Sequence, residues 1–74
     1  MPLPQRMLTL DDVAEILNVS YSQVYAIVRR EELRAGKIGG KGIWRVAPGD
    51  LEAYIDGCYE ETHRWIVANP FVEK

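Results

Sequence analysis

The fold is decided between residues 9 and 30, where the chain runs TLDDVAEILNVSYSQVYAIVRR. Thr9 is a favourable N-cap residue, and the carboxylates of Asp11 and Asp12 suit the positive end of a helix dipole. Apolar residues then recur at helical spacing, which predicts one buried stripe on a first helix that ends at Asn18. The stripe consists of Leu10, Val13, Ala14 and Leu17, with Ile16 beside it, and Val19 is expected to turn inward after it.

A second helix is predicted to open at Ser20, because Ser20-Tyr21-Ser22-Gln23 has the form of a capping box, S-x-x-Q. Its apolar face is expected to consist of Val24, Ile27 and Val28. The outward or edge positions are then Tyr21, Ser22, Tyr25, Ala26, Arg29 and Arg30. Two short amphipathic helices joined by about three residues form a helix-turn-helix, in which the second helix enters the major groove of DNA.

The pattern after Leu33 changes to a period of two, which predicts two strands at residues 34–38 and 43–46. A glycine-rich turn of hairpin length, Gly39-Gly40-Lys41-Gly42, lies between them. Strands this short are stable only when they pack against other elements. The side chains expected to pack on the helices are Ile38, Trp44 and Val46, and those expected to point outward are Lys37 and Arg45.

A third helix is predicted to begin near Pro48, which is favoured at the first helical position, and to continue to about Val67. Gly57 in its interior costs roughly 1 kcal/mol relative to alanine and marks a candidate break. The predicted fold class is therefore mainly α with a small β-hairpin. It is a winged helix-turn-helix, made of the helix-turn-helix, a two-stranded wing and a C-terminal helix.

Charge is distributed unevenly along a chain whose formal net charge is −2. Residues 23–46 hold six basic side chains against two acidic ones, whereas the segments before and after are both acidic. The phosphate backbone of DNA responds to the local patch more than to the total, because salt screens charges beyond roughly 8–10 Å. The central segment is therefore the candidate DNA-facing region. Its basic residues are Arg29, Arg30, Arg34, Lys37, Lys41 and Arg45.

The run from Leu8 to Ser20 resembles the opening of the excisionase-type helix-turn-helix family, which is related to the DNA-binding heads of mercury-resistance-type (MerR-like) regulators. Three further stretches are similar to that family in the same order, so the resemblance covers roughly residues 8–55. They are Val24-Tyr25 with Arg29-Arg30 ahead of Leu33, Lys37-Ile38-Gly39-Gly40 with Trp44-Arg45-Val46, and Asp50-Leu51-Glu52-Ala53-Tyr54-Ile55. The resemblance implies a winged domain with the second helix in the major groove and the wing against the adjacent backbone or minor groove.

Three positions depart from the family pattern. Ala26 stands where the family usually carries a basic side chain, which removes one expected DNA contact. Glu31 stands where a glycine commonly follows the arginine pair, which implies a different or a strained helix ending. Gly36 occupies a strand position that is usually apolar, and Gly42 adds flexibility to the wing. The tail after Gly57 falls outside the resemblance.

The candidate DNA-binding side chains lie on the second helix and the wing. They are Tyr21, Ser22, Gln23, Tyr25, Arg29, Arg30, Lys37, Lys41 and Arg45. Glutamine can pair bidentately with adenine, although Gln23 is also the residue that closes the capping box. Arg29 and Arg30 are expected to contact phosphates, the alternative being a favourable interaction with the helix dipole alone. Trp44 is assigned to the core rather than to base stacking.

Composition argues against an enzyme, a metal site and a membrane span. The chain holds one cysteine, Cys58, and one histidine, His63, which cannot form an intramolecular disulfide or a zinc site on their own. The sequence shows no stretch of about 18 apolar residues, no signal peptide, and no P-loop or nucleophile–base pair. A cytoplasmic protein without cofactors is therefore expected.

The sequence thus predicts a protein that binds double-stranded DNA and has no enzymatic activity. The role that the resemblance favours is that of an excisionase, a recombination directionality factor that bends DNA and directs an integrase, because the chain is little more than a DNA-binding head. A small transcriptional regulator of the same fold is the first alternative. The second is a protein-interaction module or antitoxin subunit that uses the apolar C-terminal tail.

Three regions are predicted along the chain: a flexible N-terminal arm (1–7), a winged helix-turn-helix DNA-binding domain (8–57), and a C-terminal helical extension and tail (58–74). The tail is unusually apolar for a terminal segment. Its large apolar side chains are Trp65, Ile66, Phe71 and Val72. Two roles are open to them: they complete the small core, or they form a surface for self-association on DNA.

Overall fold

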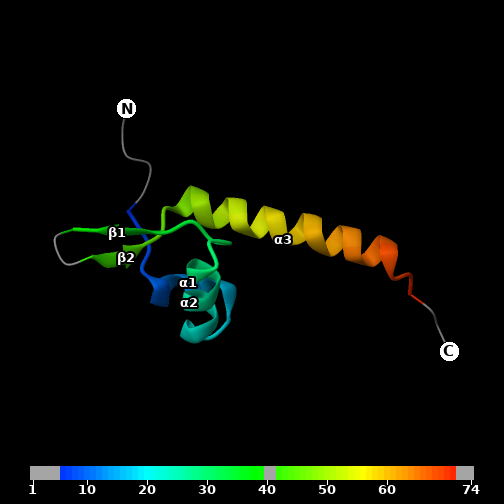
Figure 1. Cartoon of the computed structure of the whole chain (residues 1–74), viewed down its shortest axis with the longest axis horizontal. Helices are drawn as coiled ribbons and strands as arrows, with labels where there is room; N and C mark the ends of the chain where they lie inside the picture. The colour runs from blue at the N-terminus through cyan, green and yellow to red at the C-terminus, as the bar shows by residue number, and fades with distance from the viewer. Residues whose placement is uncertain (1–5, 40–41, 72–74) are drawn as a thin grey trace.

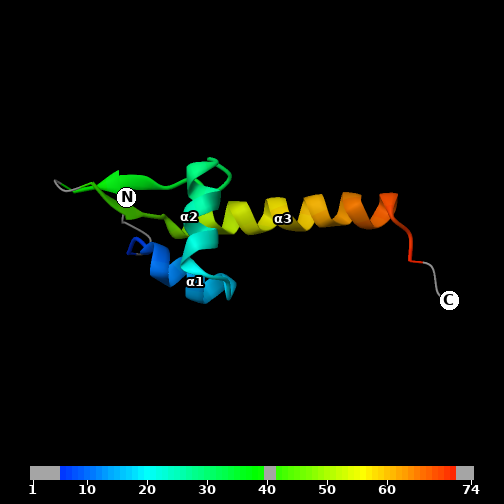
Figure 2. The ribbon, with the colours of Figure 1, turned by 60° about the horizontal axis from the view of Figure 1, so that its bottom comes forward.

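The computed structural model describes residues 6–39 and 42–71, which form helices and a two-stranded hairpin (Figure 1). In chain order the elements are α1 (Leu10–Leu17), α2 (Tyr21–Arg29), β1 (Gly36–Ile38), β2 (Ile43–Arg45) and α3 (Pro48–Ala68). Helices α1 and α2 pack together, the hairpin projects to one side of them, and α3 extends to the other (Figure 1, Figure 2). The predicted winged helix-turn-helix is confirmed.

Both helices of the helix-turn-helix are closed by the capping boxes that their sequences indicate. The Thr9 hydroxyl accepts a hydrogen bond from the Asp12 amide at 2.9 Å, and the Asp12 carboxylate accepts one from the Thr9 amide at 3.0 Å. Ser20 and Gln23 repeat the arrangement at 3.2 and 3.4 Å. These bonds satisfy amides that have no partner within their own helix, and so they fix where α1 and α2 begin.

The turn between α1 and α2 depends on Asn18, whose φ of 60° lies in the left-handed region. Asparagine tolerates this conformation because its short polar side chain can form local hydrogen bonds. Val19 follows, and its amide donates to the Ala14 carbonyl at 3.0 Å. Its side chain is exposed, because Val19 spans the corner between the two helices, so the prediction that it joins the core is wrong.

The core forms where α1, α2, the end of the wing and the start of α3 meet. Its buried side chains are Leu10, Val13, Val24, Ile27, Val28, Leu33, Val46 and Leu51. Full burial of an aliphatic side chain stabilises a fold by about 1.5–3 kcal/mol, so this single cluster holds the elements together. Leu8 and Val46 exchange two backbone hydrogen bonds of 2.8 Å, which fasten the segment before α1 to the end of the wing.

Two residues after the end of α2, Glu31 adopts the left-handed conformation, with a φ of 61°. The amides of Glu32 and Leu33 both donate to the Ile27 carbonyl, at 2.9 and 3.2 Å, and so reverse the chain directly after the helix. The left-handed conformation costs a residue with a Cβ about 1–2 kcal/mol, a cost that glycine avoids. Glu31 therefore carries the strained helix ending that its departure from the family pattern implies.

The wing is a short antiparallel hairpin. Its paired residues are Gly36 with Arg45, Lys37 with Trp44, and Ile38 with Ile43. Gly39 and Gly42 have φ angles of 88° and 63°, which glycine adopts without strain, whereas the predicted turn residues Gly40 and Lys41 lie outside the described residues. The expectation that Ile38 packs on the helices is wrong: it is 50% exposed, because this end of the hairpin extends beyond them (Figure 2).

Helix α3 is continuous through Gly57, so the candidate break at that residue is wrong. A glycine lowers the stability of a helix without interrupting its hydrogen bonds. Leu51 enters the core and Tyr54 and Ile55 pack partly against it, but every described residue from Tyr59 onward is exposed. The helix therefore leaves the rest of the molecule about halfway along its length, and the molecule measures 56 × 31 × 19 Å (Figure 1).

The side chains of the C-terminal segment do not complete the core. Trp65 is 63% exposed, Ile66 is 54% exposed and Phe71 is 88% exposed. Val72 and the first five residues of the predicted N-terminal arm lie outside the described residues. Of the two roles left open for the tail, completion of the core therefore does not apply to the described part of the chain, since α3 carries these residues away from the domain.

Candidate nucleic-acid interface

Helix α2 presents a polar, aromatic and basic face on the side opposite to its core contacts. Val24, Ile27 and Val28 are buried, and the helical period places the remaining positions at the surface. The predicted DNA-binding residues of α2, all exposed, are Tyr21, Ser22, Gln23, Tyr25, Arg29 and Arg30. Ala26 lies among them, half-buried, and leaves the middle of this face without a charged side chain.

Four side chains form an aromatic–cation row that runs from α2 to the wing: Arg29, Tyr25, Trp44 and Lys37. The Arg29 guanidinium donates a hydrogen bond of 3.0 Å to the Tyr25 hydroxyl. The Tyr25 and Trp44 rings meet edge to face, with centroids 6.5 Å apart and an interplanar angle of 79°. The Lys37 ammonium lies 5.2 Å from the centroid of the Trp44 indole ring. The row thus has a cation at each end of an aromatic pair and joins α2 to both strands of the wing.

Trp44 has two roles in this arrangement. It packs partly against the core, as its sequence position predicts, and it also supports Tyr25 on α2 and Lys37 on β1. Edge-to-face aromatic pairs contribute about 0.5–1.5 kcal/mol beyond their buried area. Sequence reasoning missed the second role, because no spacing along the chain shows that residue 44 meets residue 25. The pairing of Lys37 with Trp44 did have a local signal, because the glycine-rich turn between the two strands indicates a hairpin.

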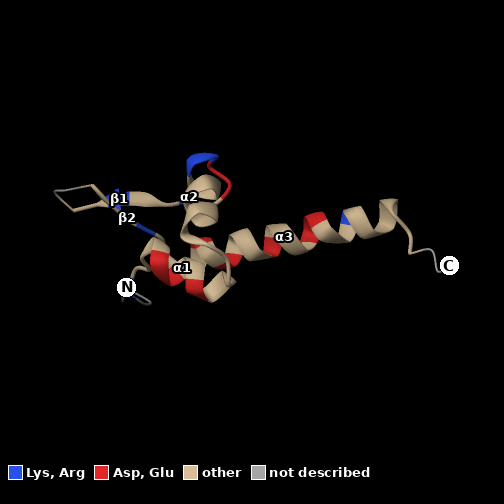
Figure 3. Ribbon diagram, turned by 90° about the horizontal axis from the view of Figure 1, so that it is seen from below, with Lys and Arg blue, Asp and Glu red and all other residues tan. Residues whose placement is uncertain are grey.

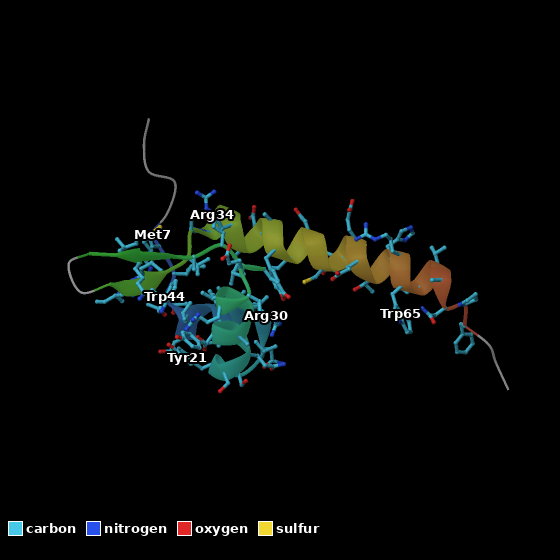
Figure 4. The ribbon with its side chains drawn as sticks, viewed as in Figure 1. Met7, Tyr21, Arg30, Arg34, Trp44 and Trp65 are labelled. Atoms are coloured by element: carbon cyan, nitrogen blue, oxygen red, sulfur yellow. The ribbon has the colours of Figure 1, made fainter. Side chains whose placement is uncertain are left out.

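Arg30 lies outside the aromatic–cation row. Its guanidinium forms a bidentate ion pair with the Glu32 carboxylate, at 3.0 and 3.3 Å. The hydrogen bond raises the pKa of Arg30 and lowers the pKa of Glu32. Both groups are about half exposed, so the pair is weakly stabilising. Figure 4 shows Arg30 on the opposite side of α2 from Trp44, so the structure separates it from the other predicted contacts.

Gln23 and Ser22 differ in how free they are to read a base. The Gln23 side-chain oxygen accepts a hydrogen bond from the Ser20 amide at 3.4 Å, which leaves its amide nitrogen as the group available to a ligand. Bidentate pairing with adenine requires both groups, so it would break one half of the capping box. Ser22 is exposed in the first turn of α2, the end of a recognition helix that contacts base edges.

A shallow hollow with a volume of about 340 Å³ lies between the start of α2 and the wing. Tyr21 borders it from α2, Asp11 from the start of α1, and Ile43, Trp44 and Arg45 from β2. Figure 4 shows Tyr21 and Trp44 on the same side of the molecule. The helix face and the wing therefore frame one continuous surface.

The predicted wing residues have different surroundings. Lys37 is exposed over the indole of Trp44, as expected. Arg45 was expected to point outward but is half-buried, because its guanidinium donates to the Trp44 carbonyl at 2.7 Å. Its positive charge also helps to lower the pKa of Asp12, after the larger effect of the Thr9 hydrogen bonds. Lys41 lies outside the described residues.

The charges of the described residues are segregated by element (Figure 3). Basic side chains gather on the wing and at the end of α2, whereas acidic ones lie on α1, on the loop after α2 and along α3. A negatively charged polymer is therefore attracted to the face of α2 and the wing and repelled by the rest of the molecule.

These features define a winged helix-turn-helix domain of the DNA-binding class, with α2 as the recognition helix. The chain belongs to the helix-turn-helix domain family, whose model matches residues 7–59 and so spans α1, α2, the wing and the first half of α3. No curated protein and no solved structure matches the chain in the other two comparisons. Domains of this family are typically non-enzymatic DNA-binding units.

Two further features, a metal-ligand cluster and a membrane-spanning helix, are absent from the described residues. Within residues 6–39 and 42–71, no group of three His, Cys, Asp or Glu side chains is placed to hold a metal ion. None of the helices in this part of the chain combines the length and hydropathy that crossing a bilayer requires.

Proposed function

We propose that the chain is an excisionase, a cytoplasmic protein that binds and bends duplex DNA and so directs an integrase towards excision. Helix α2 occupies the major groove, and the wing contacts the neighbouring minor groove or backbone. The observation that carries the proposal is the aromatic–cation row, because it joins the two DNA-contacting elements through packed side chains. The family match and the resemblance to excisionase-type proteins support the same class.

Bending follows from the way the row restrains the wing. When α2 and the wing are held at a fixed separation, the DNA must adapt its grooves to them. Smooth bending of a short site by 40–90° costs on the order of 1–6 kcal/mol, which phosphate contacts must offset. Arg29 and Lys37 are the described cations best placed to make those contacts, since each lies at one end of the row.

Sequence preference is assigned to the first turn of α2. Tyr21 and Ser22 are exposed there, and Tyr21 borders the hollow between α2 and the wing. The start of a recognition helix is the part that reaches base edges. Ala26 offers only a methyl group, which suits contact with the methyl group of thymine. We expect few direct hydrogen bonds to bases and a large share of recognition through DNA shape.

A transcriptional regulator related to mercury-resistance-type proteins is the second candidate, and the long exposed α3 favours it because such a surface suits a further subunit. The two roles differ in what happens to the DNA. The test begins with selection of a preferred site from a random duplex pool, followed by gel mobility of that site at permuted positions in a fragment. An excisionase gives position-dependent mobility and cooperative binding of adjacent copies. Binding without either effect would contradict the excisionase role and support the transcriptional regulator.

A further inference from the structure

Helix α3 continues its core-facing stripe beyond the point where the core ends. Leu51, Cys58 and Trp65 are spaced seven residues apart, so they lie along one line of the helix. Leu51 is 5% exposed, Cys58 is partly buried and Trp65 is 63% exposed. Figure 4 shows Trp65 projecting from α3 far from the helix-turn-helix. A tryptophan on this line has no cover from the described residues of its own chain.

The same line of α3 contains a hollow of the shape that receives such a side chain. Its floor on the helix is made by Tyr54, Gly57, Cys58 and Glu61, and Glu32 borders it from the loop after α2. These four positions of α3 have the spacing i, i+3, i+4 and i+7, which forms the hole of knobs-into-holes packing between helices. The hollow has a volume of about 370 Å³.

Gly57 makes the hollow larger than another residue would. It lies in the helix interior, and a Cβ built on it would meet no atom within 4 Å, so packing among the described residues does not require a glycine there. Glycine lowers helix stability relative to alanine, and nothing in the described chain offsets that loss. A large side chain from outside, seated over Gly57, accounts for it.

We propose that a second copy of this chain covers this face, with the two α3 helices antiparallel and Trp65 of each copy seated in the hollow of the other. The hollow is centred between residues 57 and 58, about seven residues from Trp65. Both insertions occur together only when the helices run in opposite directions about a two-fold axis near residue 61. In a parallel symmetric pair, Trp65 would instead face the same residue of its partner.

Charge on the flank of the stripe supports the antiparallel arrangement. Glu61 and Arg64 lie on the same side of α3, and the same sides of two antiparallel helices meet across a two-fold axis. At a rise of 1.5 Å per residue, each Glu61 then lies about 4 Å along the axis from Arg64 of the other copy. This contact offsets the repulsion between the two Glu61 carboxylates near the axis. Among the described residues of one chain, the ion pair of Arg64 is an exposed contact of 3.8 Å with Glu60.

The contact is small, because it involves one side of about four helical turns. Interfaces below roughly 1,200 Å² are typical of weak or transient complexes, so we expect dissociation in the micromolar range. The pairing does not depend on the proposed function, since it is measured without DNA.

The test is sedimentation velocity of the full chain from about 1 to 500 μM, without DNA. The wild type is expected to pass from monomer to dimer, and Trp65→Ala is expected to weaken association at least tenfold. Val67→Ala is the matched control: Val67 is equally exposed but lies on the opposite side of α3, so its loss should leave association unchanged. A wild type that stays monomeric throughout this range overturns the proposal.

Gly57→Ala separates association from folding. Alanine stabilises the helix, so the thermal midpoint of the dilute monomer is expected to rise by about 4–8 °C. The same methyl group occupies the space over residue 57 in which Trp65 of the other copy is proposed to sit, so the dimer is expected to weaken at least tenfold. A variant that is more stable and dimerises like the wild type would contradict the insertion of Trp65 over Gly57, and a loss of stability would contradict the open space found there.

A disulfide cross-link tests the direction of the helices. In a Cys58→Ser background, Glu61→Cys places a thiol next to the two-fold axis and is expected to form an intermolecular disulfide readily under mild oxidation. His63→Cys, on the outer side of α3, is expected to cross-link at least tenfold more slowly. Equal rates for the two cysteines would contradict the antiparallel pair.

Discussion

At residue 31 the backbone adopts a left-handed conformation although the side chain is a glutamate. Because this conformation is strained for any residue with a Cβ, Glu31→Gly is expected to raise the free energy of unfolding by about 1 kcal/mol. Urea denaturation followed by circular dichroism measures the change. Glu52→Gly is the matched control: Glu52 is exposed within α3, so there the same substitution is expected to lower stability by about 1 kcal/mol. A decrease in both variants would contradict the strain at Glu31.

Asp12 gives the start of α1 a pH dependence. The hydrogen bonds from Thr9, the backbone amide first, lower the pKa of Asp12 below 3.8 in the folded protein. A carboxylate with a lowered folded pKa stabilises the fold above its unfolded pKa and loses that effect as pH falls through the folded value. The stability difference between wild type and Asp12→Ala should therefore be constant above about pH 5 and shrink below pH 3.8. Denaturation midpoints across this range measure it, and a constant difference would contradict the assignment.

Single residues also show where sequence reasoning stops at this scale. The capping roles of Thr9 and Ser20 were predictable, because a cap and its partner lie three residues apart in the chain. The ion pair of Arg30 with Glu32 was less predictable, because Glu31 and Glu32 both lie within two residues of Arg30. The structure therefore distinguishes Arg29 from Arg30, which the basic pattern treats alike.

Among the elements, the contact between α2 and the wing has the clearest functional consequence. Tyr25→Phe keeps the edge-to-face contact with Trp44 but removes the hydroxyl that holds Arg29. Arg29 must then be ordered on binding, which costs about 0.5–1.5 kcal/mol for one long side chain. The affinity for duplex DNA is therefore expected to fall by about two- to tenfold, while stability changes little. Fluorescence anisotropy and thermal denaturation measure the two quantities.

Tyr59→Phe is the control for this variant, since Tyr59 is exposed on α3, beyond the part of that helix that packs against the core. It is expected to leave DNA affinity unchanged. If Tyr25→Phe binds DNA as tightly as the wild type, the hydroxyl does not position Arg29 for binding.

The elements themselves were largely predictable, because helix caps, helical periodicity and a glycine-rich turn are local signals. The packing of the wing was less predictable: Ile38 was expected to pack on the helices but is exposed. A period of two shows which side chains share a face of the hairpin, but not how far the helices extend beneath that face. The edge-to-face contact of Tyr25 with Trp44 depends on how the elements assemble, and no local pattern encodes it.

At the scale of the whole molecule, the sequence predicted the length of α3 but not that the second half of this helix is uncovered by the rest of the chain. Helical spacing of apolar residues continues to Ile66 whether or not another surface covers them. The core ends near Cys58 because α1, α2 and the wing are too small to cover a helix of 21 residues. Because α3 is long, its uncovered apolar stripe lies away from the DNA-binding face and forms a second, distinct surface.

The net charge of −2 conceals a strongly asymmetric molecule. The wing and the end of α2 are basic, while α1 and α3 are acidic (Figure 3). The most direct test of the DNA-binding face therefore compares variants that lose the same number of positive charges at different places on the surface. Two double variants do this: Arg29→Ala with Lys37→Ala, and Arg30→Ala with Arg34→Ala. Each removes two positive charges, but only the first pair belongs to the aromatic–cation row.

The measurement is binding to random-sequence duplex DNA by fluorescence anisotropy across a salt series. The wild-type affinity should fall steeply with salt, and loss of Arg29 and Lys37 should reduce the slope of log K against log salt by about 1.8, or about 0.9 for each phosphate contact. Loss of Arg30 and Arg34 should reduce it by less than half as much. Equal reductions would show that binding responds only to total charge, and an absence of wild-type binding at low salt would contradict the DNA-binding assignment of this face.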